Sequence, residues 1–416
     1  MKKQQETILE SSQEFAGGSG TLKDPYLISN VQQLSNIRNH LDSYYKQVND
    51  IYNTPEHDNF MFEPIGDFVR KDHTDNVAFT GVLDGNGYKL ISWGPIFELI
   101  GNKGEVKNLA IESTLCQNEI IISRFYDCNG SIARYNKGTI ENCSVMKDQI
   151  FGSLYIGGLV GYNIGYIADC YFQGKVMGDN YVGGIAGYNS GFLTNNIARG
   201  FRSGDKCGGI TGVNDGMIED CIDGGINQGK EFIGGITGIN HSNISRTYSY
   251  SSCRGQNYIG GLVGNNNGKV LDCLARGYIS YNWQANRPSL SKHGSDNNLD
   301  QSKNSNVSSQ KQLAGGLVGK NQKYIARSYS DCNIEGFSEP AGITFNSMEG
   351  ESEVIDSYYN PEDKLDEKNN ILENWDNADT AFLNDRKLPV IDAESNIKQK
   401  AIKRAKKVGD DYVYMW

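Results

Sequence analysis

Proline is scarce in this sequence: there are 8 prolines in 416 residues, beside 49 glycines. Average proteins contain about 5% proline and about 7% glycine, so proline is depleted and glycine is enriched. The chain has no Gly-X-Y period, which excludes collagen. It has no apolar run of about 18 residues, which excludes membrane-spanning helices. Abundant glycine without proline predicts tight turns that recur within a hydrogen-bonded sheet.

Basic charge and metal-binding motifs are also lacking. The net charge is −10 and the pI is about 5.1, so the body of the chain is not expected to bind nucleic acid. The nine cysteines form no CxxC pair and there is no HExxH motif, so neither a disulfide framework nor a protease zinc site is indicated. His57 and His73 lie in a polar segment, 52–77, that we expect to be a solvated loop. No catalytic residue, metal or cofactor is predicted.

The sequence does contain an internal repeat. A Gly-Gly pair recurs at steps of 26, 25, 26, 26 and 55 residues, with first glycines at Gly157, Gly183, Gly208, Gly234, Gly260 and Gly315. About 30 extra residues between Tyr281 and Leu313 account for the long step. Weaker copies at Gly130-Ser131 and Ala341-Gly342 bring the array to about eight units. A period of this length is typical of a repeat architecture.

Other residue types keep the same register. An asparagine follows six residues after the first glycine, at Asn136, Asn163, Asn189, Asn214, Asn240, Asn266 and Asn321. Glycine is common two residues later, at Gly138, Gly165, Gly191, Gly216 and Gly268. An aliphatic residue follows, at Ile140, Ile167, Leu193, Ile218, Ile244, Val270, Ile325 and Val354. A small residue comes three positions after it, at Cys143, Cys170, Asn196, Cys221, Thr247, Cys273, Ser328 and Ser357.

The repeat predicts an all-β fold, a parallel β-helix or solenoid of about eight coils of about 26 residues each. Three short strands and tight turns fit one such coil. Stacked coils place equivalent residues over one another, so the asparagines can form a ladder of side-chain hydrogen bonds. The Asn-x-Gly spacing suits a corner, because both residues tolerate positive φ. The aliphatic and small columns are expected to face inward.

A charged column precedes the small residues, at Asn142, Asp169, Asn195, Asp220, Arg246, Asp272, Arg327 and Asp356. Strand alternation predicts that it points outward. Its signs alternate from Asp220 to Asp356, so like charges are not stacked. The column is interpreted as a stabilising surface ladder.

These motifs resemble the GLUG repeat family, named for a Gly-Leu-any-Gly core. The segments at 157–163, 183–189, 260–266 and 315–320 match that core closely. The resemblance extends over about residues 16–392, because 20–39 and 44–51 look like an entry segment, 79–90 like a first coil and 373–391 like a closing segment. Family members are bacterial surface adhesins and non-catalytic regions of some immunoglobulin-A-cleaving metalloproteases. The resemblance implies a right-handed solenoid with a surface or binding role, and it carries over no catalytic residue.

The ends of the stack require caps, since an open coil exposes unpaired strand edges. A small N-terminal α/β cap is expected, with a helix over 31–41 that Ser29 or Asn30 could N-cap. The predicted organisation is a disordered N-terminus (1–15), the cap with first coils (16–125), the repeat solenoid (126–360), a C-terminal cap (361–392) and a tail (393–416).

Two polar segments do not fit the repeat. Residues 285–312 are low in complexity and predict a disordered insertion. The tail is basic and then aromatic, and it is either a solvated end or a docking peptide for a protein partner. Its candidate docking residues are Lys403, Arg404, Lys406, Lys407, Tyr412, Tyr414 and Trp416.

The preferred function is a non-enzymatic adhesin or structural component of a cell-surface or appendage assembly, which binds protein, glycan or both. A phage tail fibre or spike and a carbohydrate-active β-helix enzyme are the alternatives. An extracellular or cell-surface location is expected, although no apolar segment of a signal peptide follows Lys2 and Lys3, which leaves a virion or the cytoplasm open. Sugar stacking, or else core packing, is considered for the aromatic residues Tyr162, Tyr171, Phe172, Tyr181 and Tyr188.

Overall fold

The computed structural model describes residues 14–53, 62–67, 77–91, 94–112, 127–281, 313–337, 339–346 and 352–359. Several expectations lie outside the described residues: the insertion, the closing segment, the tail with its seven candidate docking residues, and both histidines of the polar loop.

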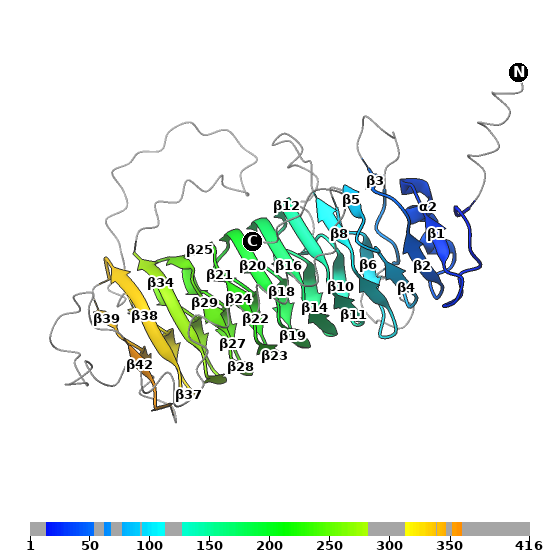
Figure 1. Cartoon of the computed structure of the whole chain (residues 1–416). Helices are drawn as coiled ribbons and strands as arrows, with labels where there is room; N and C mark the ends of the chain where they lie inside the picture. Colours follow the sequence, from blue (N-terminus) through cyan, green and yellow to red (C-terminus); the bar gives the residue numbers. More distant parts are fainter. Residues whose placement is uncertain are drawn as a thin grey trace, which may run out of the picture.

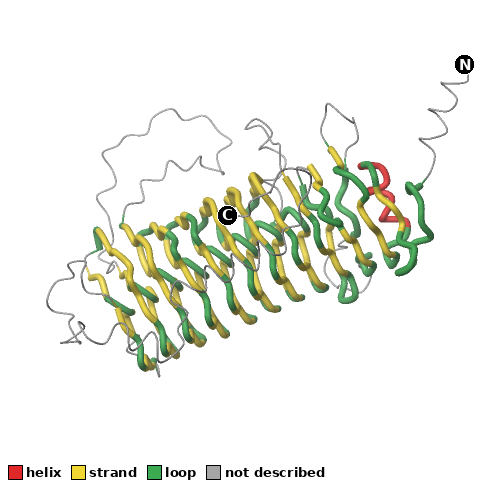
Figure 2. Tube along the Cα trace, in the orientation of Figure 1, coloured by secondary structure: helices red, strands yellow, loops and turns green. Residues whose placement is uncertain are grey.

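The described chain is a rod of stacked β-coils, as the repeat predicts (Figures 1 and 2). Its strands form four sheets of 12, 13, 8 and 9 strands, and every pair of named strands runs parallel, as in the contact of β15 with β19. One coil contributes a strand to each sheet in turn, and the next coil repeats the path. The parallel β-solenoid is therefore confirmed.

The 12-stranded sheet contains one strand of each coil, beginning with β1, and the 13-stranded sheet begins one coil later, with β3. The first contains β1 (Tyr26–Ile28), β2 (Tyr44–Gln47), β4 (Val82–Asp84), β7 (Glu105–Lys107), β11 (Thr139–Glu141), β15 (Tyr166–Ala168), β19 (Phe192–Thr194), β23 (Met217–Glu219), β28 (Asn243–Ser245), β33 (Lys269–Leu271), β37 (Tyr324–Ala326) and β41 (Glu353–Ile355). The second contains β3 (Ile51–Tyr52), β5 (Lys89–Ile91), β8 (Ala110–Glu112), β12 (Ser144–Phe151), β16 (Tyr171–Met177), β20 (Ile197–Ser203), β24 (Ile222–Asp223), β25 (Ile226–Gln228), β29 (Tyr248–Ser249), β30 (Ser252–Arg254), β34 (Leu274–Ser280), β38 (Tyr329–Glu335) and β42 (Tyr358–Tyr359).

The other two sheets lie on either side of the Gly-Gly pairs in sequence. The 8-stranded sheet contains β9 (Cys128–Asn129), β13 (Tyr155–Gly157), β17 (Tyr181–Gly183), β21 (Lys206–Gly208), β26 (Glu231–Gly234), β31 (Asn257–Gly260), β35 (Leu313–Gly315) and β39 (Glu339–Ala341). The 9-stranded sheet contains β6 (Phe97–Ile100), β10 (Ala133–Asn136), β14 (Val160–Asn163), β18 (Ala186–Asn189), β22 (Thr211–Asn214), β27 (Thr237–Asn240), β32 (Val263–Asn266), β36 (Val318–Asn321) and β40 (Thr344–Asn346).

The expectation of three strands per coil is wrong for the repeat, because each coil from β9 to β42 has at least four strands. The difference arises at the Gly-Gly pair: β17 ends at Gly183, and β18 begins at Ala186 after a bend. A Cβ on Gly184 would lie 2.2 Å from the carbonyl oxygen of Gly209 in the next coil. The Gly-Gly pair therefore forms a corner where adjacent coils approach too closely for a side chain. This corner divides into two strands a segment that the sequence predicts to be one.

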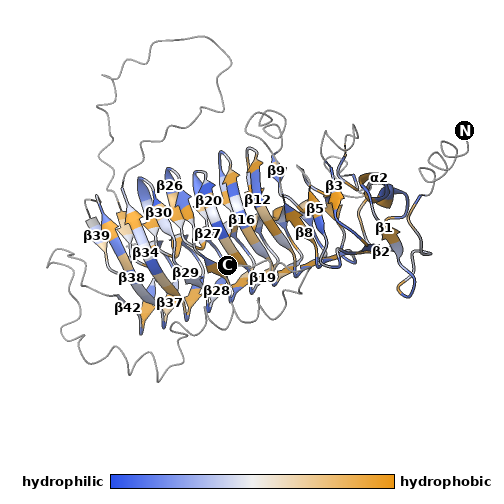
Figure 3. Cartoon of the chain, turned by 45° about the horizontal axis from the view of Figure 1, so that its top comes forward, coloured by the Kyte–Doolittle hydropathy of each residue, from blue (hydrophilic) through white to orange (hydrophobic). Residues whose placement is uncertain are grey.

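The inward columns are confirmed. The aliphatic column from Ile140 to Ile325 is fully buried, and the small column from Cys143 to Ser328 is at most 2% exposed. Figure 3 shows hydrophilic and hydrophobic residues alternating along many strands, as expected for coils with one face inside.

The two predicted corner conformations differ from the observed ones. The glycines after the asparagines do not have positive φ; instead, a Cβ on Gly191 would lie 2.0 Å from the carbonyl oxygen of Gly165. The charged column does have positive φ, for example 55° at Asp169 and 48° at Arg246. It therefore marks a left-handed corner between two sheets rather than alternate positions of a strand. Asparagine and aspartate tolerate this conformation better than most residues.

The N-terminal end is covered by a short helical segment, α2 (Val31–Ser35) followed by the 3-10 helix η1 (Asn36–Asn39). Asn30 is the N-cap, and its side-chain oxygen accepts a hydrogen bond from the backbone N–H of Gln33 at 2.9 Å. The α-helix is shorter than the predicted 31–41, because the chain must return to pair β2 with β1. Coil stacking begins at β1, so the 12-stranded sheet exceeds the eight units counted from the glycine pairs.

A charged pair lies inside the solenoid, where the repeat predicts apolar side chains. Arg202 and Asp223 are completely buried and form an ion pair. Asn227 donates to Asp223 Oδ2 at 2.9 Å, and Arg202 Nη2 donates to the carbonyl oxygen of Gly209 at 3.3 Å. Burial lowers the pKa of Arg202 to about 10, which still leaves the guanidinium charged at neutral pH.

We expect Asp223→Ala to lower the free energy of unfolding by about 3–5 kcal/mol, because it leaves the Arg202 charge buried without its partner. The double variant Arg202→Met/Asp223→Leu should lose much less, since it removes both charges and keeps apolar volume. Urea denaturation followed by circular dichroism measures both. A double variant that is no more stable than Asp223→Ala would contradict the prediction.

Candidate binding surface

The seven asparagines of the repeat lie at the ends of their strands in the 9-stranded sheet, and all are completely buried. Each Nδ2 donates to the Oδ1 of the next asparagine at 2.8–2.9 Å, from Asn136 to Asn321. Strand register places Ile100 before this ladder and Asn346 after it. The structure thus brings all seven residues into one chain of hydrogen bonds, which no external partner can reach.

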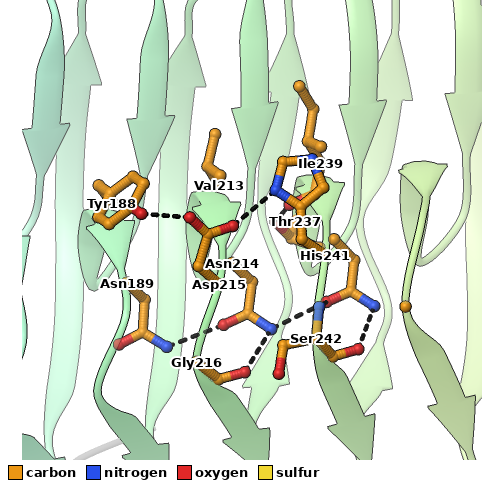
Figure 4. A network of polar contacts seen from close by, with 12 residues as sticks. Tyr188, Asn189, Val213, Asn214, Asp215, Gly216, Thr237, Ile239, His241 and Ser242 are labelled. Carbon is orange, nitrogen blue, oxygen red and sulfur yellow. Dashed lines mark hydrogen bonds and ion pairs between the residues drawn. The ribbon is translucent and has the colours of Figure 1, made fainter.

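The ladder also holds the adjoining corner in place. Asn214 Nδ2 donates to Gly216 O at 3.0 Å as well as to Asn240 Oδ1 at 2.9 Å, while Asn214 Oδ1 accepts from Asn189 (Figure 4). Each internal asparagine therefore uses both its donor and its acceptor groups. A residue that lacks either function leaves buried polar atoms without partners.

Five tyrosines form a second cluster on the outside of the solenoid. This tyrosine cluster comprises Tyr135, Tyr155, Tyr162, Tyr181 and Tyr188, all half-buried. Tyr162 stacks on Tyr188 with ring centroids 4.4 Å apart, and Tyr155 stacks on Tyr181 at 5.2 Å. Tyr155 also meets Tyr162 and Tyr188 edge-on, each at 5.5 Å. The two stacks, from the 8-stranded and 9-stranded sheets, therefore pack as one unit.

The sequence identified only part of this cluster. Tyr162, Tyr181 and Tyr188 belong to it, whereas Tyr171 is 6% exposed and Phe172 is completely buried. These last two rings pack in the core and cannot stack on a sugar. Tyr135 and Tyr155 were missed, although they occupy the same repeat positions as Tyr162 and Tyr181.

A row of polar side chains continues from the cluster along the rod axis. The hydroxyl of Tyr188 donates to Asp215 Oδ2, and Asp215 Oδ1 lies 2.6 Å from His241 Nδ1. Figure 4 shows Asp215 between the other two side chains, above the asparagine ladder. Burial and the hydrogen bond to Asp215 raise the pKa of Tyr188, so its phenol stays protonated and donates. Lys206 lies 5.5 Å above the Tyr181 ring.

Large apolar side chains are exposed at the neighbouring corner. We call Ile164, Tyr166 and Phe192 the aromatic corner; they are 48%, 40% and 52% exposed. Tyr166 and Phe192 are register partners that begin β15 and β19. Glu141 and Glu219 are in register with Ala168 and Thr194, two residues after Tyr166 and Phe192. Burial and the negative charges of Asp169, Glu141 and Glu219 raise the pKa of Tyr166.

The charged column forms pairs across coils on the outer surface. Arg246 Nε and Nη2 each lie 3.0 Å from an oxygen of Asp220, and Arg327 makes the same two contacts with Asp272 at 2.7 Å. These bidentate pairs join coils that follow one another, so the alternating signs support stacking.

Chemical groups for metal binding or nucleophilic attack do not gather in the described part of the chain. Its His, Cys, Asp and Glu residues form no group of three or more that could hold a metal ion. Seven of the eight described cysteines are buried, and burial raises the pKa of Cys221 and Cys273 to about 12. Such thiols stay protonated and are poor nucleophiles. No helix within the described ranges is long and apolar enough to cross a membrane.

We expect Asn214→Asp to lower the free energy of unfolding by about 2–3 kcal/mol, because a carboxylate cannot donate to Asn240 and Gly216. Burial should raise the pKa of the new carboxyl group, so the loss should shrink as the pH falls and that group becomes a neutral donor. Denaturation across a pH series tests this, with Asn243→Asp on a half-buried strand position as the control. Equal losses for both variants would contradict the ladder's role.

Asp215→Asn should lower the pKa of Tyr188 toward its ordinary value, because the charged acceptor that favours the protonated phenol is removed. The ultraviolet absorbance of phenolate, followed during alkaline titration, measures this pKa after subtraction of the Tyr188→Phe titration. An unchanged or higher value in Asp215→Asn would show that the hydrogen bond does not act on Tyr188.

Comparisons with known proteins identify one matching family model and several similar proteins. The family model described as the GLUG motif matches residues 152–177, which span β13 to β16. A "Putative Gly-rich membrane protein" of Evansella cellulosilytica is 32% identical over 147 residues, 32% of this chain and 16% of that protein. "Halomucin" of Haloquadratum walsbyi is 31% identical over 163 residues, 35% of this chain and 2% of that protein.

The matches therefore span less than one fifth of either relative's length. A crystal structure of a "putative immunoglobulin A1 protease" from Bacteroides ovatus aligns with 84% of this chain and 88% of that one, with 16% identity and a TM-score of 0.40. The motif match falls on one unit of the asparagine ladder and includes Asn163. The unit at residues 152–177 thus matches the GLUG motif, and the other coils repeat its glycine and asparagine positions.

Proposed function

We propose that the chain is a non-enzymatic, surface-associated β-solenoid that binds a partner outside the cell, as an adhesin or as a structural component of a surface or appendage assembly. The observation that carries the proposal is the contrast between the two sides of the coil. Inside are ladders and apolar columns. On the outer surface of residues 135–192 lie the tyrosine cluster and the exposed aromatic corner.

The proposed location draws support from the two relatives, which are named as a Gly-rich membrane protein and a halomucin. Each matches about a third of this chain. An extracellular or cell-surface position for the chain is part of the proposal.

The hydrogen bonding of Asp215 favours binding over catalysis. Polysaccharide hydrolysis requires carboxyl groups that are free to transfer a proton or attack the sugar. Both oxygens of Asp215 are engaged, one by the Tyr188 hydroxyl and the other by His241. Asp215 therefore orients its neighbours and remains an acceptor.

The test is surface labelling of intact source cells with antibody to the full chain, combined with incubation of purified chain with those cells. We expect labelling without permeabilisation, saturable binding of added chain and no release of reducing sugar. Labelling only after permeabilisation would contradict the proposed location. Release of sugar that disappears in Asp215→Asn would replace the binding function with an enzymatic one.

A further inference from the structure

The residues of the aromatic corner can be compared with the residues at the equivalent positions of the other coils. Other coils place mostly polar residues in register with Tyr166 and Phe192 along the 12-stranded sheet. They are Glu105, Thr139, Asn243, Lys269 and Glu353, besides Val82, Met217 and Tyr324. The corner position of Ile164 is occupied in other coils by Lys137, Ser190, Asp215, His241, Asn267 and Gln322. Coil stacking therefore does not require large apolar groups here. Their presence on two adjacent coils needs another cause.

The rings of the corner differ from those of the tyrosine cluster in what they can offer a ligand. Tyr162 and Tyr188 cover each other's faces, so they present edges and hydroxyl groups. The ring contacts of the described residues include neither Tyr166 nor Phe192, and about half of each side chain is exposed. An incoming ring can therefore lie against them. The face of an aromatic ring is electron-rich and attracts slightly positive C–H groups.

The polar groups around the corner limit the chemistry of that ligand. Glu141 and Glu219 lie on the coils that flank β15 and β19, in register with Ala168 and Thr194, and Asp169 directly follows β15. Asp215 accepts a hydrogen bond from the hydroxyl of Tyr188. Carboxylates accept hydrogen bonds from hydroxyl groups and repel anions. Protein interfaces have cores depleted of Asp and Glu, whereas here carboxylates border three apolar side chains. The combination suits a ring with apolar C–H faces and hydroxyl edges that carries no negative charge.

We propose that the aromatic corner, with the adjoining Tyr188–Asp215–His241 row, binds the pyranose rings of a neutral glycan. The sugar faces lie on Tyr166 and Phe192, and their hydroxyl groups donate to the neighbouring carboxylates. Because the corner spans two coils, successive sugars of one polymer can follow the rod axis. This inference rests on the proposed function and names its ligand class and site.

The experiment measures binding of the full chain to immobilised neutral polysaccharides (dextran, mannan and a soluble starch) and to two polyuronates (alginate and polygalacturonate). We expect binding to at least one neutral polymer and to neither polyuronate. Tyr166→Thr and Phe192→Asn, which introduce the residues of equivalent coils, should each weaken binding about tenfold or more, because one stacked ring is lost. Tyr278→Ser, at a 47% exposed tyrosine on the 13-stranded sheet, is the control and should bind normally.

Thermal unfolding of each variant should match that of the unchanged chain, which separates lost contacts from lost fold. Absence of binding to every neutral polymer, equal binding to polyuronates, or unchanged affinity in both corner variants would overturn the inference. On source cells, periodate treatment should abolish the Phe192-dependent binding and protease treatment should spare it. The reverse pattern would identify a protein ligand and also overturn the glycan assignment.

The two proposals fail in different ways. If the chain binds intact cells but Phe192→Asn binds equally well, the aromatic corner is not the site and the surface function stands. If the chain neither labels nor binds those cells, the proposed function itself fails.

Discussion

Every part of this molecule depends on one constraint: each coil hydrogen-bonds to the next at the spacing of neighbouring parallel strands, about 4.8 Å. Each residue therefore contacts the equivalent residue of the next coil. The residue type at each repeat position must be compatible with a contact with itself or with its substitute. Asparagine meets the requirement with an amide that both donates and accepts, as in the 2.8 Å contact between Asn163 and Asn189. Glycine meets it where backbones approach too closely for a Cβ. In the charged column, opposite signs at Asp220 and Arg246 turn a repulsive column into an attractive one.

The same constraint explains why irregular positions are informative. Inside the rod, Arg202 and Asp223 replace apolar residues with a buried ion pair, and the strand that would join β24 to β25 is interrupted beside it. Outside the rod, Ile164, Tyr166 and Phe192 expose apolar surface where other coils carry mostly polar groups. The first irregularity is paired within the core, where Arg202 and Asp223 form an ion pair. The second is not covered by any described residue, which is why it carries the binding hypothesis.

The asparagine ladder stabilises the fold from inside the rod, whereas the residues proposed to bind a ligand lie on its outer surface. The ladder is completely buried and rigidifies the corner that precedes the exposed residues. The tyrosines of the cluster are half-buried, and the stacked faces of their rings pack against one another. The proposed ligand contacts are therefore made by exposed rings and hydroxyl groups on the outer surface, and the stacked coils hold these groups in place. A rod of this kind can vary its outer positions at little cost to its stability.

The period and its columns could be obtained from the sequence, because in-register stacking makes every structural column visible as a recurrence about every 26 residues. That reading established the solenoid, the inward small residues and the asparagines that meet in the ladder. It could not separate buried from exposed aromatics, as Phe172 and Tyr162 show, since both belong to short strands with similar neighbours.

Tertiary structure alone decided the bend that makes four strands per coil, the left-handed corner at Asp169 and the diagonal pairing of Arg202 with Asp223. These depend on backbone direction and on side-chain reach between coils, which linear spacing does not contain.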